Sequence, residues 1–482
     1  MKAKARQWML IVVASAGLLA GCAVGPDYKR PPTTPPETFR GQTGPAEAAS
    51  LADLPWWEAF RDPTLQELLQ TALANNYDLR TAVASVEQAR ALAAAARGAF
   101  FPSIGYQGEI QRARGGAFGS VFVIPGQPTP TRSSFVGLFT ASWELDIWGR
   151  IRRQYEAARA QFFATEEARR GVLLSLVSNV AQAYFQLLEL DAQLDIAKRN
   201  TASFQGSYNL FQRRLQFGLA STLETSRAEG ALGSTASTIP DLERQIAAQE
   251  NQISVLLGRN PGPIPRGTPL FEQAVVPEVP AGLPSVLLER RPDILQAEQQ
   301  LVQANAQVGL AEANFFPQLT LSGFGGGVSP QLSAFSHVWS LAAGLSGPIF
   351  QGGQILENYR AFVAAWEQAK LQYEQAVITA FQEVASALTA LERLAHAEAE
   401  QARAVKAYQD SVRIATRRYE GGLANYYEVL EAQQLLFPAE TQLAQTRANR
   451  LFTYVQLYRV LGGGWSLADP QWSGPQAQRQ AP

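Results

Sequence analysis

The sequence predicts an α+β membrane protein built from two tandem repeats, and three observations lead to this fold class. Most of the chain between residues 61 and 463 occurs twice in the same order. Within each copy the hydrophobic pattern changes from the helical period to the two-residue period of a strand and back again. Each copy also contains a proline-free stretch, 131–239 and 349–437, that is longer than the helices of a compact domain require.

Composition excludes several classes of function. The 482 residues carry 41 basic and 42 acidic side chains, and this near-zero net charge provides no field for a nucleic-acid partner. One cysteine and two histidines exclude a disulfide framework and a Cys- or His-based metal centre. Nucleophile, phosphate-loop and zinc-protease motifs are missing from the sequence. We therefore expect no enzyme activity, no catalytic residue, no bound metal and no cofactor.

Residues 1–21 are typical of a secretory signal peptide. Basic residues precede an apolar run from Trp8 to Ala20 that is too short to span a bilayer, and small residues lead to Cys22. This lipobox pattern predicts that Cys22 becomes the N-terminus and carries a covalent lipid. Because Ala23 and not aspartate follows, analogy with bacterial lipoprotein sorting predicts the outer membrane. The alternative is an ordinary cleaved signal with a coincidental cysteine.

Two proline-rich segments lie outside the repeats, one before the first repeat and one between the two repeats. Within residues 22–60 the many prolines prevent helix formation. This segment is therefore expected to form an extended tether that follows the lipidated cysteine. We assign the first repeat to 61–260, a proline-rich connector to 261–284 and the second repeat to 285–463. The remaining residues, 464–482, are expected to form a flexible tail.

Three matched segments define the internal repeat. The stretch from Asn76 to Pro102 aligns with the stretch from Arg291 to Pro317, and both end in Phe-Phe-Pro. Farther on, Phe-Gly-Leu-Ala at 217–220 aligns with Gly-Gly-Leu-Ala at 421–424, and Leu-Gly at 257–258 aligns with Leu-Gly at 461–462. The main change in spacing between the copies falls between the two predicted strands, so the first hairpin has the longer loop.

Each repeat begins with a helix and continues with a pair of strands. Residues 65–97 lack Gly and Pro and predict one long helix. Apolar and polar residues then alternate over 103–110 and, after a Gly-rich loop, over 135–146. The second repeat has the same alternation over 318–322 and 339–346. Each repeat therefore contributes one hairpin with an apolar face.

Two environments suit such hairpins, and the sequence favours one of them. A sheet packed on a soluble core shows the same alternation as a membrane strand. Aromatic residues crowd the strand ends, as in a membrane girdle, and a lipoprotein signal precedes them. The membrane interpretation is therefore preferred. Because four strands cannot close a barrel and open edges are not tolerated in lipid, the chain is expected to oligomerise.

The second strand of each hairpin leads into a very long helix. Residues 149–212 correspond to roughly 60 helical residues, or about 90 Å. In the second repeat, two apolar stripes with helical spacing run along 377–415, so this helix is expected to contact neighbours on two sides. Two such contacts suit a cylinder of helices, whereas the alternative is a buried helix of a four-helix bundle.

Several motifs together resemble the TolC/OprM-like outer-membrane factors, in the lipoprotein branch called NodT-type. They are the lipobox followed by Val-Gly-Pro-Asp-Tyr at 24–28, the segment Trp-Trp-Glu-Ala-Phe-Arg-Asp-Pro at 56–63, Arg-Arg-Pro-Asp-Ile at 290–294 and Ala-Asn-Phe-Phe-Pro at 313–317. The resemblance implies a homotrimer that shares a twelve-stranded outer-membrane β-barrel, continuous with a long periplasmic α-helical barrel. It further implies the exit duct of a tripartite efflux pump, with a periplasmic adaptor (membrane fusion) protein and an inner-membrane transporter of the resistance-nodulation-division type as partners.

By the same resemblance, the adaptor docks at two helix-turn-helix tips. These map to 214–222 and 418–426, and their candidate docking residues are Gly218, Leu219, Ala220, Gly422, Leu423 and Ala424. A plain connecting turn explains the glycines. It does not explain why a leucine recurs at an exposed tip.

The segment 427–433 resembles the part of the family that forms the periplasmic aperture. Tyr427 and Glu431 are one helical turn apart and face the same side. Three copies of Glu431 near an axis would repel one another and attract cations. The aligned first-repeat positions are Leu223 and Arg227, and Arg227 is a candidate partner for a carboxylate of a neighbouring helix. The alternative is that all four are ordinary surface positions.

Two other functions stay open on the sequence alone. One is a lipid-anchored periplasmic coiled-coil scaffold or adaptor, in which the hairpins form a small soluble domain. The other is the outer-membrane channel of a type I secretion system, which uses the same kind of duct. The exported cargo and the inner-membrane pump are not encoded in any motif of this chain.

Overall fold

A computed structural model describes residues 23–42, 50–53, 60–114, 131–274, 282, 284–332 and 334–463. The signal peptide, Cys22, the Trp56–Trp57 segment, the Gly-rich loop and the C-terminal tail therefore lie outside the described residues. The chain divides into two units, one formed by Met1–Pro32, Val86–Thr165 and Ala297–Tyr373, the other by the remaining segments. The elements follow in the order η1 (Leu51–Asp53), α3 (Pro63–Asn75), α4 (Tyr77–Gly98), β1 (Ser103–Arg114), β2 (Thr131–Leu145), α5 (Arg150–Gln216), α6 (Thr222–Ala236), α7 (Thr238–Leu256), η2 (Leu270–Glu272), α8 (Pro284–Arg290), α9 (Pro292–Ala313), β3 (Gln318–Ser329), β4 (Ser336–Ser346), α10 (Gln354–Glu420) and α11 (Tyr426–Val460).

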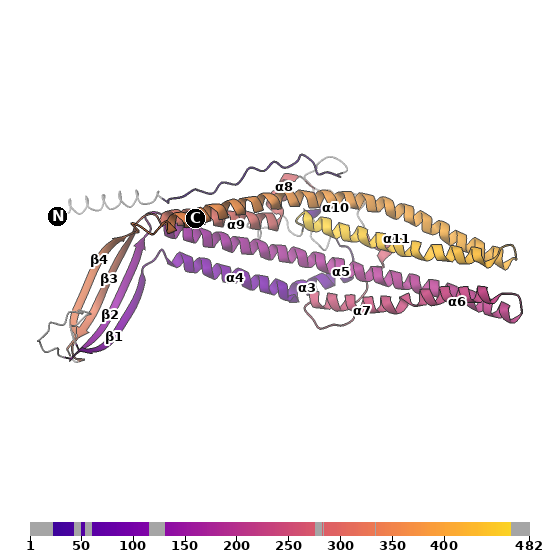
Figure 1. Ribbon diagram of the computed structural model, residues 1–482, viewed down its shortest axis with the longest axis horizontal. Helices are drawn as coiled ribbons and strands as arrows, with labels where there is room; N and C mark the ends of the chain where they lie inside the picture. The colour runs from indigo at the N-terminus through magenta and orange to yellow at the C-terminus, as the bar shows by residue number, and fades with distance from the viewer. Residues whose placement is uncertain are drawn as a thin grey trace. The chain divides into compact units, whose positions relative to one another are not determined.

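The first unit contains one antiparallel sheet with the strand order β1-β2-β3-β4 (Figure 1). Both predicted hairpins are confirmed, and the register places residues of the same sheet face opposite each other. Tyr106 pairs with Phe139, which lies opposite Gly325, and Gly325 lies opposite Trp339. Residues 115–130 separate β1 from β2, whereas only 330–335 separate β3 from β4, so the longer loop is in the first hairpin as predicted.

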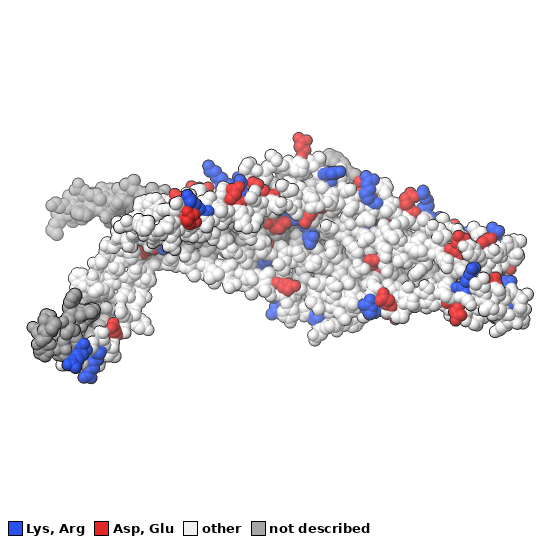
Figure 2. Space-filling model, viewed as in Figure 1, with Lys and Arg blue, Asp and Glu red and all other residues white. Residues whose placement is uncertain are grey.

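One face of this sheet is apolar and exposed. Seven large apolar side chains on it are between 69% and 86% exposed: Ile104, Tyr106, Ile110, Phe139, Trp339, Leu341 and Leu345. On the side shown in Figure 2 the strands carry few charges along their length, and charged side chains gather at the end of the sheet that includes Arg112 and Arg114. In water this apolar face would promote aggregation. In a lipid bilayer the same side chains contact apolar lipid tails, which is energetically favourable.

The extended segment 23–32 belongs to the same unit and is held by side chains of the helices. Arg153 donates to the carbonyl oxygen of Gly25 at 3.1 Å and forms an ion pair with Asp27 at 3.0 Å. Glu298, which is almost fully buried, accepts from the Tyr28 hydroxyl at 3.1 Å and from Arg30 at 2.8 Å. Because the segment has few backbone partners of its own, these side chains fix its path.

The second unit contains the greater part of the long helices α5 and α10, and at its first two helices one sequence prediction is wrong. The helix expected over 65–97 is two helices, because Asn76 interrupts it. Asn76 adopts an extended ψ of 131°, its side-chain oxygen accepts from the Leu79 N–H at 3.0 Å, and its amide donates to the Leu256 carbonyl at 2.9 Å. The residue thus ends α3, caps α4 and binds the end of α7.

The second repeat is interrupted at the aligned position. Arg291, between α8 and α9, donates to the Val460 carbonyl at the end of α11, and it binds Asp293 and Glu383 at 2.6 and 2.7 Å. Arg290 donates to the Gly462 carbonyl. Gly258 and Gly462 follow the last helix of each repeat with φ values of 68° and 72°, which terminate both helices in the same way.

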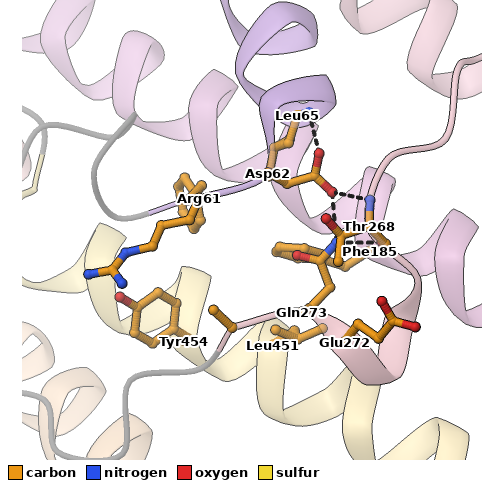
Figure 3. Close-up of a pocket in the computed structure, with 11 residues that line it drawn as sticks. Arg61, Asp62, Leu65, Phe185, Thr268, Glu272, Gln273, Leu451 and Tyr454 are labelled. Carbon is orange, nitrogen blue, oxygen red and sulfur yellow. Dashed lines mark hydrogen bonds between the residues drawn. The ribbon is translucent and has the colours of Figure 1, made fainter.

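A buried carboxylate attaches the connector between the repeats to the helices. Asp62, 2% exposed, caps α3 through the Thr64 and Leu65 N–H groups and also accepts from the Tyr184 hydroxyl at 3.0 Å. The Thr268 N–H and the Gln273 amide donate to the same carboxylate at 3.1 and 2.7 Å. Figure 3 shows Asp62 with Leu65, Thr268 and Gln273 around it, and these residues line a cavity of about 100 Å³.

The long helices α5 and α10 agree with the predicted ones, and both apolar stripes on α10 are buried at Ala380, Val384, Ala387, Leu388 and Leu391. One stretch of α5 is long and apolar enough to cross a membrane, but most of it is buried inside the molecule, as expected for a core helix. After the tip, the first repeat has two helices, α6 and α7, separated at Ser237. The second repeat has one helix, α11, that contains Pro438.

Burial also alters one carboxyl group of α5. Glu189 is 7% exposed, and among the described residues its side-chain partners are the neutral amides of Gln186 and Gln193. Burial raises the pKa of Glu189 to about 7, against the lowering effect of the two amides. The folded state therefore favours the protonated acid.

We expect Arg291→Met to destabilise the protein by on the order of 3 kcal/mol, because it leaves two carboxylates and a helix-end carbonyl without their buried partner. Thermal unfolding of the purified protein measures this. The matched control is Arg90→Met, since Arg90 forms an exposed ion pair with Glu87 on a helix surface and should change stability by less than about 1 kcal/mol. Equal effects of the two substitutions would contradict the prediction.

Glu189 predicts a pH dependence of stability. Its folded pKa lies above the unfolded value of about 4.5, so its contribution is fully present below pH 4.5 and is lost as the pH rises toward 7. Glu189→Gln should therefore raise the unfolding temperature at pH 8 by a few degrees and leave it nearly unchanged at pH 4.5. Asp195→Asn, an exposed change on the same helix, should shift neither. A Glu189→Gln protein less stable than the parent at pH 8 would refute this account.

Candidate functional site

The predicted tips are two turns with the same backbone geometry. The Leu219 N–H donates to the Arg214 carbonyl and the Leu423 N–H to the Arg418 carbonyl, both at 2.8 Å. Gly218 and Gly422 occupy the left-handed region with φ values of 71° and 73°. A side chain at either position would strain the turn, so glycine permits this reversal of the chain in both repeats.

Apolar side chains are exposed at these turns. Leu219 and Leu423 are 67% and 76% exposed, and Ala220 and Ala424 are half-buried beneath them. Phe217, 77% exposed, belongs to the same surface and was not identified from the sequence. Phe217 begins the Phe-Gly-Leu-Ala segment that matches the second tip, and this position could have indicated its role. The aligned residue of the second repeat is Gly421, so the aromatic residue itself is not repeated. Two neighbouring turns thus present one aromatic ring and two leucines to solvent.

An aromatic cluster behind the turns joins the two repeats. The rings of Phe211 and Tyr426 lie 4.1 Å apart, and Tyr419 is within 6.0 Å of both. Arg214 donates to the Tyr419 hydroxyl at 2.6 Å and lies over its ring. Burial raises the pKa of Tyr419 and of Tyr426, so both remain protonated hydroxyls.

Sequence reasoning missed this cluster as well. The heptad spacing of Phe204 and Phe211, both buried on α5, was the signal for it. The cluster makes the ends of α5, α6, α10 and α11 one packed body, with Ala228 and Val429 among its members.

The four expected aperture residues lie on the exposed surfaces of α6 and α11. Tyr427 and Leu223 are each 59% exposed, and Glu431 and Arg227 are also exposed. The opposite face of α11 is buried. Within the described part of one chain, neither Arg227 nor Glu431 forms an ion pair. The carboxylate partner expected for Arg227 is therefore not found within a single described chain.

A nearby ion pair and helix cap are present at the tips. Arg418 and Glu428 lie 3.9 Å apart across the second turn. Ser221 and Glu224 form a reciprocal cap at the start of α6, whereas Asn425 at the start of α11 makes no such side-chain bond. The first tip is thus more firmly capped than the second. The described residues contain no cluster of three or more His, Cys, Asp or Glu side chains that could hold a metal ion.

Comparison with known proteins gives consistent matches along the chain. The family model described as outer membrane efflux protein matches residues 68–259 and again 283–463. The chain is 34% identical over 468 residues to a probable efflux pump outer membrane protein of Pseudomonas putida, TtgC, which covers 95% of this chain and 96% of that protein. It is 35% identical over 454 residues to the cation efflux system protein CusC of Escherichia coli, covering 93% and 96%. The solved structure of the outer-membrane channel OprN is similar with a TM-score of 0.85 and 30% identity, covering 92% of this chain and 100% of that one.

The aromatic cluster predicts how firmly the tips are held. Phe211→Ala removes a fully buried ring, so we expect a local loss of about 3 kcal/mol and faster amide exchange at 217–221 and 421–425. Hydrogen–deuterium exchange with mass spectrometry measures both turns. Phe217→Ala, which removes an exposed ring six residues away, should leave the exchange unchanged. Faster exchange at only one turn would show that the cluster does not join the repeats.

Proposed function

The chain belongs to the outer membrane efflux protein family, and from this premise we propose that three copies of it assemble into one passive exit duct. As a member of this family it is an outer-membrane efflux channel that extends into the periplasm. The proposal concerns the assembly and the residues that carry each step. It includes no catalytic activity of the chain itself.

The exposed apolar face of the four-stranded sheet is the observation that carries the proposal. Among the described residues, β1 and β4 have no neighbour on their outer edges. Unpaired edges are not tolerated in lipid, and single-chain barrels need at least about eight strands. Three chains would supply twelve strands and pair every edge. The same face argues against a soluble scaffold, because no described element covers it.

The tips are proposed as the docking surface for a periplasmic adaptor protein. Phe217, Leu219 and Leu423 form a small exposed apolar surface at the end of the helical unit. The aromatic cluster behind them holds both turns in a fixed relation, so a partner meets a preformed surface. An inner-membrane transporter of the resistance-nodulation-division type would then supply the energy that this chain lacks.

The aperture is proposed at Tyr427, Glu431, Leu223 and Arg227. All four are exposed on α6 and α11, the two helices that begin directly after the tips. For Leu223 and Tyr427 this exposure is unusual, because apolar and aromatic side chains are normally buried. In a trimer, three Tyr427 rings and three Glu431 carboxylates would narrow the duct and favour cations. Arg227, without an ion pair in one described chain, would find its carboxylate in a neighbouring hairpin.

Cys22 is proposed as the lipid anchor. The Val24 N–H, two residues after Cys22, donates to the Trp148 carbonyl at 3.0 Å. Trp148 stacks on Phe316 with ring centroids 4.7 Å apart, and both residues lie directly beside strand ends. A lipid on the residue before Ala23 would thus enter the bilayer beside the sheet that spans it.

We expect the purified protein to form trimers that conduct ions in planar bilayers, with small conductance at rest. Tyr427→Ala and Glu431→Ala should each raise the conductance, because each shortens the side chains at the narrowest point. Glu431→Ala should also weaken the cation preference, because it removes three carboxylates. Single-channel recording under asymmetric salt measures both quantities.

Thr140→Ala and Ser142→Ala are the control variants, since they change the polar face of the sheet and not the aperture. Their conductance should equal that of the parent. The assignment fails if the double variant at 427 and 431 conducts like the parent while a strand variant conducts more. A protein that is monomeric, or silent at every voltage, would overturn the channel proposal itself.

A further inference from the structure

The strand β1 ends in two exposed arginines that no step of the proposed duct uses. Arg112 and Arg114 are an even number of residues from Ile104, Tyr106 and Ile110, so all five side chains lie on the same face of the sheet. Within the described residues, neither arginine side chain forms an ion pair or a hydrogen bond. The exposed face of β1 therefore changes from apolar to basic at the end of the sheet where Figure 2 shows basic side chains.

These arginines lie at the border of the apolar band. Strands rise about 3.4 Å per residue and tilt by about 40° in membrane barrels, so Arg112 and Arg114 lie roughly 20 and 26 Å from Ile104 along the membrane normal. The apolar band of such a barrel is about 25 Å tall. Because β1 leads away from α4 and the helices extend into the periplasm, this border is the outer one. Both guanidinium groups thus reach the headgroups of the outer leaflet.

The two hairpins supply no carboxylate to this pair. The strand β2 places hydroxyl side chains directly opposite both arginines. The sequence contains no Asp or Glu over 110–143 or over 313–356. Glu109 is three residues before Arg112, so its side chain points to the other face of the sheet. Neither hairpin therefore neutralises the two positive charges, although the chain as a whole is nearly neutral.

The repeat predicts which residue of a second copy lies beside this pair in the proposed assembly. In the first hairpin Ser103 pairs with Ser142, and in the second hairpin Gln318 pairs with Ser346. The strands β3 and β4 are thus equivalent to β1 and β2 with shifts of 215 and 204 residues. The long helices α5 and α10 agree with the second shift, since their first residues are also 204 residues apart.

The contact between the two hairpins of one chain then serves as the template for the contact between copies. Phe135 of β2 lies opposite Ser329 of β3. With the same shifts, Trp339 of one copy lies opposite Arg114 of the next, and the apolar faces of both strands remain on the same side of the barrel. Trp339 is 77% exposed in one chain. A guanidinium beside an indole ring is a favourable arrangement.

We propose that Arg112 and Arg114, together with Trp339 of the neighbouring copy, form a site for the phosphate group of an outer-leaflet lipid at each junction between copies. This inference rests on the proposed assembly of three chains. A guanidinium binds phosphate through two parallel N–H donors, and indole rings are suited to the headgroup level. The acyl chains of the lipid contact the apolar face of β1 and β4, so one bound lipid touches two copies.

Native mass spectrometry of the detergent-purified, full-length protein tests this site, because one spectrum gives both the number of chains and the number of bound lipids. The probes are diphosphoryl lipid A, monophosphoryl lipid A and monoglucosyl diacylglycerol, which is a glycolipid without charge. The trimer should bind one diphosphoryl lipid A at each junction, the monophosphoryl form more weakly and the uncharged lipid most weakly. Equal affinity for the diphosphoryl and the uncharged lipid would overturn the site without any substitution.

A pair of substitutions locates the site on the chain. Arg112→Gln with Arg114→Gln should lower the affinity for diphosphoryl lipid A about thirtyfold, since each arginine near an anionic lipid surface contributes about a factor of five. The matched control is Arg393→Gln with Arg403→Gln, which removes two charges from exposed positions of α10. This control should bind like the parent. Equal affinity of the first variant and the parent would overturn the proposal.

Inorganic phosphate distinguishes a lipid site from a general anion site. In large excess it should leave diphosphoryl lipid A bound, because the acyl chains add apolar contacts that free phosphate lacks. Complete displacement of the lipid by phosphate would overturn the assignment to a lipid.

Disulfide formation between copies tests the contribution of Trp339. Trp339→Cys with Arg114→Cys places two cysteines directly opposite each other, and neighbouring copies should cross-link. The control, Trp339→Cys with Arg112→Cys, places them diagonally at about 7–8 Å, which is beyond the reach of a disulfide. If the first pair does not cross-link faster than the control, Trp339 is not part of the site and the proposal is overturned. A trimer that binds lipids without regard to charge refutes this inference alone, whereas a monomer overturns the proposed assembly as well.

Discussion

Each repeat is closed by a hydrogen bond from the break between its first two helices to the end of its last helix. Asn76 donates to Leu256 in the first repeat and Arg291 to Val460 in the second. The last carbonyls of a helix have no partner within it, so a buried helix end requires such a donor. Asn76 and Arg291 also directly precede α4 and α9, the helices that lead to the strands. The start of each of these helices is therefore tied to the end of the last helix of its repeat, α7 or α11. Asp62 joins the connector to this arrangement, because Thr268 and Gln273 of the connector donate to the same carboxylate that accepts from Tyr184 of α5 and from two N–H groups of α3.

The same closure is made with different chemistry in the two repeats. A neutral amide suffices at Asn76, where the backbone of Asn75 also lies against Gly258. At Arg291 a guanidinium binds two carboxylates as well as the carbonyl, and so ties α10 to the junction through Glu383. The backbone geometry is thus the shared element, and the side chains that maintain it are free to diverge. The tips follow the same rule, since their glycines match while only the first has a reciprocal cap.

The order of elements and the repeat could be predicted from the sequence because they depend on period and turn chemistry, which are local. The break at Asn76 was missed, although the repeat alignment placed Asn76 opposite Arg291, directly before a proline that no helix interior accepts. The turns at Gly218 and Gly422 could be predicted, because a left-handed backbone conformation favours glycine and the glycine is visible in the sequence. Phe211, Tyr419 and Tyr426 were not found as a cluster, because their contact joins segments about 200 residues apart.

The two repeats also differ on the face proposed to line the duct. The aligned pairs there are Leu223 with Tyr427, Arg227 with Glu431 and Asp241 with Gln445. If the six hairpins of a trimer alternate around its axis, each Arg227 lies between two Glu431 residues, and opposite charges alternate around the aperture. Such a ring closes through mutual attraction and needs no buried contact, which agrees with the exposure of these side chains in one chain. Identical repeats would place like charges side by side and hold the aperture open. The two repeats therefore share one scaffold, and under the proposed function their differences at these few positions would supply the gate.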